Sequence, residues 1–177
     1  MSFIREDSTR NATLRQIAEQ MMVAARTAPK ARGTDNLIIG TAFNETIRML
    51  SDKMKEIGER ENLSFFFRDS VNILHSTGVV LIGTRIKSLG LNCGLCGFKT
   101  CMLKDKSPST PCVFNTHDLG IAVGSAVSVA ADNRVDNRVM FSVGRAAYEL
   151  NLLGEDVPII FGIPLSASAK NPFFDRQ

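Results

Sequence analysis

Apolar and polar positions alternate in patterns that predict two long helices near the start of the chain. Between Asp7 and Arg26, apolar residues recur every three or four positions, which is the stripe of an amphipathic helix. The residues of this stripe are Leu14, Ile17, Ala18, Met21, Met22 and Ala25. Asp7 or Ser8 could cap the helix, and Pro29 ends it. Residues 44–61 repeat the pattern, so we predict a second helix there.

Short apolar runs predict the strands. The runs with β-branched residues or glycine borders are residues 37–40, 78–83, 138–143 and 157–165. Residues 62–76 fit both a helix and a strand, and we predict a helix. Two further helices are expected from Asp118 through Ala131 and over residues 145–153. This mixture of helices and strands predicts an α+β or α/β layer architecture.

Composition places the chain among globular proteins. Its 177 residues are 44% apolar and 22% charged, which excludes a disordered chain, a collagen-like fibre and a coiled coil. We expect one domain over residues 1–177. Residues 85–112 form an insert of different character, because glycine, lysine and every cysteine concentrate there.

Charge and hydropathy limit the partners and the cellular location that we expect for the protein. The net charge of only +3 argues against a nucleic-acid binder. The longest nearly apolar run, residues 119–131, is too short to span a bilayer. The N-terminal residues lack the apolar segment of a secretory signal. We therefore expect a cytoplasmic location and no membrane or nucleic-acid partner.

All four cysteines lie close together, at Cys93, Cys96, Cys101 and Cys112. A secreted disulfide scaffold would spread its cysteines to join distant segments, so this grouping favours a reducing compartment. The first three thiolates can converge on one small object, and the fourth returns after a short loop. The glycines between them let the backbone turn tightly and bring N–H groups near sulfur. We predict that all four are metal ligands.

Two kinds of metal centre compete for these thiolates. Structural zinc is usually held by two separated pairs of cysteines, and the chain has no second pair of this type. The spacing therefore favours a [4Fe-4S] cluster with four thiolate ligands. Zinc remains an alternative, as do unliganded thiols or disulfides. His117 or a solvent ligand could replace Cys112 as the fourth ligand.

Positive charge concentrates beside the cysteines. From Arg85 to Lys106 there are five cations and one acid, a net +4, so the rest of the chain sums to −1. Such a segment offsets the negative charge of a thiolate-ligated cluster or attracts an acidic electron-transfer partner. A solvated lysine-rich loop is the alternative interpretation.

The motif CGLCGFKTC resembles the CGxCGxxTC element of small 4Fe-4S domains in corrinoid iron-sulfur proteins and electron-transport complex subunits. The chain as a whole resembles the bacterial and archaeal ferredoxin-domain proteins. The segments that carry this second resemblance are AARTAPKARGTDNLIIG, CGLCGFKTC, DLGIAVGSAV, VDNRVMFSVG and GIPLSASAKNPFFDR. The resemblance implies a bound iron-sulfur cluster and no particular reaction.

A more distant similarity is to the nitroreductase-like flavoproteins. Their AAxxAPSxxNxQPW segment has a counterpart in residues 24–36, and their glycine- and alanine-rich helix has one in residues 118–131. The resemblance implies an α+β fold with helices flanking a nitroreductase-like sheet, here with an inserted cysteine-rich loop. It also implies an FMN site at the interface of a homodimer, and hydride chemistry. The phosphate clamp of that family, Arg-Arg-Ser-x-Arg, is poorly matched by Arg5, Ser8 and Arg10.

Cations and polar groups gather where such a flavin site would lie. We predict that Arg26, Thr27, Lys30, Arg32 and Asn36 contact FMN. The cations suit its phosphate and the polar groups suit its ring edge. The alternative is that the basic residues only complement the C-terminal dipole of the preceding helix.

The sequence thus predicts a redox protein in which a cluster exchanges electrons with a flavin that acts on a small-molecule substrate, together with a redox partner protein. No catalytic residue is predicted. One alternative is a non-catalytic electron carrier with a cluster and no flavin, and another is a zinc-stabilised interaction module. No Ser-His-Asp grouping, paired carboxylates or phosphate-binding loop is present, so hydrolase and kinase functions are excluded.

Overall fold

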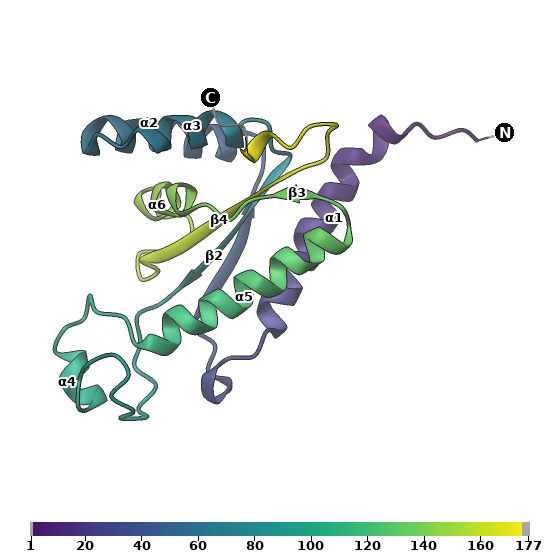
Figure 1. The fold of residues 1–177 in the computed structure, drawn as a ribbon. Helices are drawn as coiled ribbons and strands as arrows, with labels where there is room; N and C mark the ends of the chain where they lie inside the picture. The colour runs from purple at the N-terminus through teal and green to yellow at the C-terminus, as the bar shows by residue number, and fades with distance from the viewer. Residues whose placement is uncertain (1, 175–177) are drawn as a thin grey trace.

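The computed structural model describes residues 2–174 as a four-stranded sheet with helices on both faces (Figure 1). The strands are β1 (Leu37–Ala42), β2 (Gly78–Thr84), β3 (Asp136–Asn137) and β4 (Ile159–Ser166). The helices are α1 (Glu6–Thr27), α2 (Glu45–Glu61), α3 (Ser64–Ile73), α4 (Cys101–Asp105), α5 (Val113–Asp132) and α6 (Phe141–Glu149). Two 3₁₀ turns are η1 (Ala31–Gly33) and η2 (Pro172–Phe174).

The sheet has the strand order β1-β2-β4-β3, and neighbouring strands are antiparallel. Leu37 of β1 pairs with Thr84 of β2, while Gly78 at the start of β2 pairs with Leu165 of β4. One end of the sheet therefore carries the start of β1 and the end of β2. The opposite end carries the start of β2 and the end of β4.

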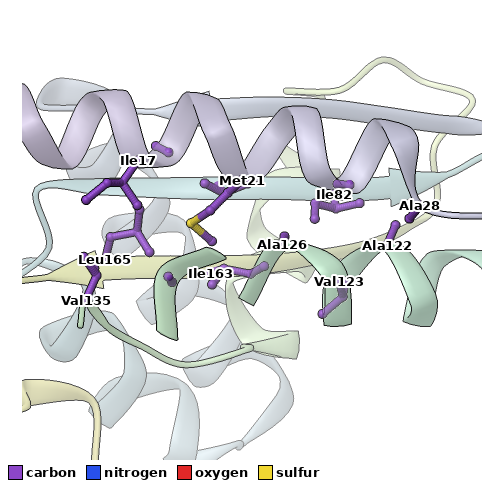
Figure 2. Packing of buried hydrophobic residues seen from close by; sticks show 14 of the residues in the cluster. Ile17, Met21, Ala28, Ile82, Ala122, Val123, Ala126, Val135, Ile163 and Leu165 are labelled. Carbon is purple, nitrogen blue, oxygen red and sulfur yellow. The ribbon is translucent and has the colours of Figure 1, made fainter. Parts of the chain in front are cut away.

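Side chains on alternate positions of β2 enter two separate apolar cores. Val80 and Ile82 belong to the core that α1 and α5 cover. Figure 2 shows Met21 of α1 and Ala126 of α5 in this core, beside Ile163 of β4. The small residues of α5 thus serve to bring that helix close to the sheet.

The second core lies on the other face of the sheet, between β2 and helices α2, α3 and α6. Val79 and Leu81 of β2 belong to it. Its closest backbone contact is between α6 and β4, because a Cβ atom added at Gly144 would lie 1.7 Å from the carbonyl oxygen of Ile160. Only glycine allows the two backbones to approach this closely.

Most of the predicted elements are present, including the helix chosen for residues 62–76, which is α3. The Gly- and Ala-rich helix, however, begins at Val113 and not at Asp118, because Cys112 and Asn115 form a capping box at its start. The Asp118 carboxylate accepts a hydrogen bond from the backbone N–H of Ala31 at 3.1 Å.

The predicted strand over residues 138–143 is the other correction. Only Met140 pairs with the sheet, as an isolated bridge to Gly162, and Phe141 already begins α6. The glycine at position 144 explains the difference, since it lets a helix lie directly on β4 where a strand was expected.

Residues 85–112, which we call the cysteine lobe, connect the end of β2 to the start of α5. In Figure 1 this segment, with α4, extends away from the sheet and its covering helices. Among the described residues, no helix is both long and apolar enough to cross a bilayer.

Candidate functional site

The four cysteines line a single small cavity in the cysteine lobe. All four are free thiols: Cys93 is exposed, Cys96 and Cys101 are half-buried, and Cys112 is buried. The cavity has a volume of about 10 Å³. Four soft sulfur donors around one space are the chemistry that binds zinc or an iron-sulfur cluster.

Backbone turns bring the first three cysteines together. Gly94 and Gly97 both have positive φ angles, +73° and +86°, and the N–H of Gly97 donates to the carbonyl of Gly94 at 2.9 Å. Asn92 then links to Cys101 in both directions. Its backbone N–H donates to the Sγ atom of Cys101 at 3.4 Å, and its side-chain Oδ1 accepts from the backbone N–H of Cys101 at 2.8 Å.

The fourth cysteine is fixed by the start of α5. Cys112 is the N-cap residue, and its side chain accepts a hydrogen bond from the backbone N–H of Asn115. The positive end of a helix dipole favours negative charge at this position. Both Cys101 and Cys112 therefore have N–H groups directed at sulfur, as is found around the thiolates of iron-sulfur clusters.

A single buried side chain holds the two ends of the cysteine lobe together. Oδ1 of Asn115 accepts from the backbone N–H groups of Lys87 at 3.1 Å and Cys112 at 3.2 Å, and Nδ2 donates to the carbonyl of Lys87 at 3.1 Å. Asn115 is 2% exposed. No sequence pattern marks this residue, because a polar position near a helix start also fits an ordinary cap.

Within residues 2–174, no three His, Cys, Asp or Glu side chains are already arranged around one metal ion. The thiolate donors fit an iron-sulfur cluster, but the cavity is only about the size of one water molecule. Loading a cluster therefore requires the turns of the lobe to move apart. His117 is exposed, lies 3.5 Å from Asp118 and does not line the cavity.

The residues predicted to contact FMN lie around the turn that follows α1, and the structure brings them near the cysteine lobe. Nη1 of Arg32 donates to the carbonyl of Leu89 at 2.8 Å, and the carbonyl of Asn36 accepts from the backbone N–H of Arg85 at 3.0 Å. The turn between α1 and β1 thus supports the base of the lobe.

The other predicted FMN contacts already have protein partners. Nζ of Lys30 donates to three carbonyls at the end of α1, and Oγ1 of Thr27 donates to the carbonyl of Val23 at 3.1 Å. Nη1 of Arg26 forms an ion pair with Asp35 at 2.5 Å. Partial burial raises the pKa of the Asp35 carboxyl, but hydrogen bonds from Arg26 and from the backbone outweigh it, so this pKa is lowered overall.

A much larger cavity, of about 630 Å³, lies at the opposite end of the sheet. This is within the usual size range of small-molecule sites. It lies between α3 and the segment that follows β4. Its lining residues are Arg68, Val71, Asn72, His75, Ser166, Ser168, Lys170 and Pro172. The lining combines three basic side chains with hydroxyl and amide groups.

One residue that lines this cavity has a buried side-chain donor without a hydrogen-bond partner. Among residues 2–174, Nδ2 of Asn72 is the buried side-chain nitrogen or oxygen atom without a hydrogen-bond partner. Leaving a buried donor unpaired costs about 1–3 kcal/mol, so such groups generally have a functional reason. A ligand with acceptor atoms in this cavity would supply the missing partner.

Arg68 is held at the edge of the same cavity by a buried carboxylate. Its Nε and Nη2 atoms donate to Oδ1 of Asp69 at 3.0 and 2.8 Å, and Oγ of Ser142 donates to Oδ2 at 2.6 Å. This site was not predicted from the sequence. A signal was present, since Arg68, Asn72 and His75 are spaced four and three residues apart; the first two lie on α3, and His75 follows the end of that helix.

Comparison with solved structures defines the class of fold. The chain superposes on a nitroreductase with bound FMN from Bacteroides fragilis with a TM-score of 0.63 and 11% identity, covering 92% of this chain and 81% of that one. For nitroreductase CinD from Lactococcus lactis, in complex with nicotinic acid, the TM-score is 0.63 and the identity 11%, with coverages of 88% and 79%. A BluB-like flavoprotein from Clostridium difficile gives 0.59 and 18%, with coverages of 88% and 81%. The fold is nitroreductase-like, as predicted.

Sequence comparison defines the family. A protein of Archaeoglobus fulgidus, named "Uncharacterized protein", is 36% identical over an alignment of 181 positions that covers 98% of this chain and 97% of that protein. A family model described as "Uncharacterized protein containing a ferredoxin domain (DUF2148)" matches residues 108–176, which include Cys112. The chain belongs to this family of ferredoxin-domain proteins. The predicted family is therefore confirmed.

Proposed function

We propose that the chain is a redox protein that holds one [4Fe-4S] cluster in the cysteine lobe and one FMN beside the sheet. The observation that carries the proposal is that all four cysteines, although spread over the lobe, line one cavity. The family description, which includes a ferredoxin domain, supports an iron-sulfur centre. The nitroreductase-like fold supports a flavin, because a solved structure of this fold binds FMN.

The proposed ligands of the cluster are Cys93, Cys96, Cys101 and Cys112. A bound cluster supplies one-electron transfer, and its potential depends on hydrogen bonds to sulfur and on solvent exposure. The backbone N–H groups of Asn92 and Asn115 stabilise negative charge on two of the thiolates. The glycine turns at the lobe supply the freedom to open around a larger group.

Anaerobic purification followed by iron, acid-labile sulfide and zinc assays tests this centre. We expect iron and sulfide in equal amounts and a broad visible absorption. Cys96→Ser should abolish that absorption, while Ser109→Ala, in the same lobe, should leave it unchanged. One equivalent of zinc without sulfide would contradict the proposal and favour a zinc-stabilised interaction module.

The flavin has two candidate positions in one chain. The turn with Lys30 and Arg32 lies near the start of β1, whereas the large cavity lies near the end of β4. These are opposite ends of the sheet, separated along the seven residues of β2 by ~20 Å. The two regions of one chain therefore do not form a single site. We infer a homodimer in which the turn of one protomer lies against the cavity of the other.

We place FMN in the large cavity of such a dimer. Arg68, His75 and Lys170 suit a phosphate, and Nδ2 of Asn72 suits an acceptor atom of the ring system. Under this arrangement Arg26, Thr27, Lys30, Arg32 and Asn36 contribute from the partner protomer or support the cysteine lobe. A cluster in the lobe of one protomer would then lie toward the flavin of the other.

Measuring FMN retained by variants tests this position. Asn72→Leu should weaken FMN binding about tenfold, because one buried hydrogen bond is lost. The same change should stabilise the flavin-free protein by ~1 kcal/mol, since the unpaired amide is removed. Asn133→Ala, at the exposed end of α5, is the control. If Arg32→Ala loses FMN and Asn72→Leu retains it, the flavin lies at the turn after α1 instead.

An iron-sulfur electron carrier without flavin is the second candidate function. It is favoured by the protein partners that the cations of the α1–β1 turn already have. Chromatography of the flavin released on denaturation separates the two: iron and sulfide without any flavin would establish the carrier.

A further inference from the structure

Large apolar side chains are exposed on the cysteine lobe. They are Leu91 (42% exposed), Leu95 (68%), Met102 (71%) and Leu103 (39%). Each lies one or two residues from a cysteine of the cavity. The lobe is too small to bury these side chains. Apolar side chains that are exposed close together mark interaction sites.

Positive charge accompanies these side chains. Lys87, Lys99 and Lys106 are exposed, and none of them forms an ion pair with any residue from 2 to 174. The other two cations of the lobe differ, because Arg85 pairs with Asp156 and the buried Lys104 pairs with Asp105. The surface of the lobe therefore carries three unpaired lysines.

Resting on the proposed function, we propose that this surface is the docking site of an acidic electron-carrier protein. We call it the lobe surface, and it consists of Leu91, Leu95, Met102, Leu103, Lys87, Lys99 and Lys106. An apolar centre with a charged rim is the usual anatomy of a transient interface. The lysines attract an acidic partner and orient it, while the apolar side chains are desolvated on contact.

The position of Cys93 makes this surface suitable for electron entry. Cys93 is exposed, so the cavity lined by the four cysteines is reached directly from the lobe surface. A docked one-electron carrier would give up one electron, and a cluster held by the four cysteines would accept it. No bond forms or breaks and no proton moves.

Charge distinguishes an acidic carrier from a second copy of this chain. A two-fold contact between lobes would place the same lysines against each other, and like charges across an interface are unfavourable. The lobe has a net charge of +4 between Arg85 and Lys106, whereas the rest of the chain sums to only −1, so a second copy offers little net negative charge to match it.

Titration calorimetry with oxidised plant-type ferredoxin, an acidic one-electron carrier, tests the proposal. We expect binding that weakens as salt is raised, and no binding of cytochrome c, a basic carrier. Reversing the three lysines to glutamate should weaken ferredoxin binding ~30-fold at low salt. Lys55→Glu, on α2, should change it less than twofold. Leu95→Gln with Met102→Gln should also weaken it, whereas Val23→Gln on α1 should not.

Iron and sulfide measured on the same samples separate the two proposals. A protein without a cluster overturns the proposed function. A protein with a full cluster whose ferredoxin binding is absent, insensitive to salt or unchanged by the lysine reversals overturns the docking proposal alone. Sedimentation provides the last check: a loss of dimer in Leu95→Gln with Met102→Gln would assign the lobe surface to a second copy and overturn the acidic partner.

Discussion

The sheet and its covering helices, which we call the body, bury apolar side chains on both faces of β2. The cysteine lobe, by contrast, buries only Leu89, Lys104 and Cys112 among residues 85–112. The body is therefore stabilised mainly by the hydrophobic effect. The lobe depends on hydrogen bonds at its base and on the chemistry of its four thiols. A segment that buries so little apolar surface usually needs a metal or a cross-link to remain ordered. The hydrophobic core and the proposed cluster ligands thus lie in different parts of the chain.

The largest effect is expected in the body, at the contact between α6 and β4. Gly144→Ala should lower the free energy of unfolding by about 3 kcal/mol or more, because the added methyl group would lie 1.7 Å from a backbone oxygen that cannot yield. Gly124→Ala, in α5, is the matched control, since an added Cβ there meets nothing within 4 Å. It should be neutral or stabilising by up to ~1 kcal/mol. Urea unfolding of both variants provides the measurement, and equal losses would contradict the packing argument.

A smaller and local effect is expected at the base of the lobe. Asn115→Ala removes three hydrogen bonds made by one buried side chain, which should lower the free energy of opening the lobe by about 2–3 kcal/mol. Proteolysis within residues 88–111 should then become ~100-fold faster. Thr116→Ala, on the exposed side of the same helix, should leave the cleavage rate unchanged. If the variant instead unfolds as a whole before any cleavage of the lobe, the lobe is not an independent unit.

The smallest effect concerns charge in the body. Arg60 and Arg145 join α2 to α6 through Glu61 and Glu149. The hydrogen bond from Arg60 and the neighbouring positive charges lower the pKa of the Glu149 carboxyl. Its contribution to stability is therefore complete above the ordinary carboxyl pKa, ~4.3, and is lost as the pH falls through the lowered value.

Glu149→Gln tests this ion pair through its pH dependence. The variant should be less stable than the parent by ~0.5–1 kcal/mol at pH 6, and the difference should shrink as the pH falls toward 3. Free energies of unfolding in urea at several pH values provide the measurement. Glu155→Gln, an exposed change, should give no such trend. A difference that stays constant with pH would show that the glutamate acts through packing.

Periodicity predicted most of the body because its elements follow the hydrophobic pattern directly. The stripe from Leu14 to Ala25 and the β-branched run of β2 both correspond to buried faces. The errors arose where a single contact decides the structure. Gly144 allows a helix where apolar residues suggested a strand, and the Cys112–Asn115 capping box begins α5 earlier than Asp118 suggested.

The two candidate sites differ in how far sequence could find them. The cysteine cavity is local, because four thiols separated by short stretches of chain must lie near one another. The structure places all four around one cavity. The large cavity depends on residues more than one hundred positions apart, from Arg68 to Lys170. Their proximity follows from the antiparallel pairing of β2 with β4, which no local pattern specifies.

The Asn115 side chain, which holds the two ends of the cysteine lobe together, affects how the lobe could be replaced by protein engineering. One side chain holds Lys87 and Cys112 beside each other, so the segment between them enters and leaves the body at nearly the same point. We therefore expect residues 88–111 to be exchangeable as a cassette, with the Arg32–Leu89 hydrogen bond lost on exchange. A short turn could replace them without disturbing the register of β2 or the start of α5, and the cassette itself could be transplanted to any scaffold that offers a strand end and a helix start at the same spacing.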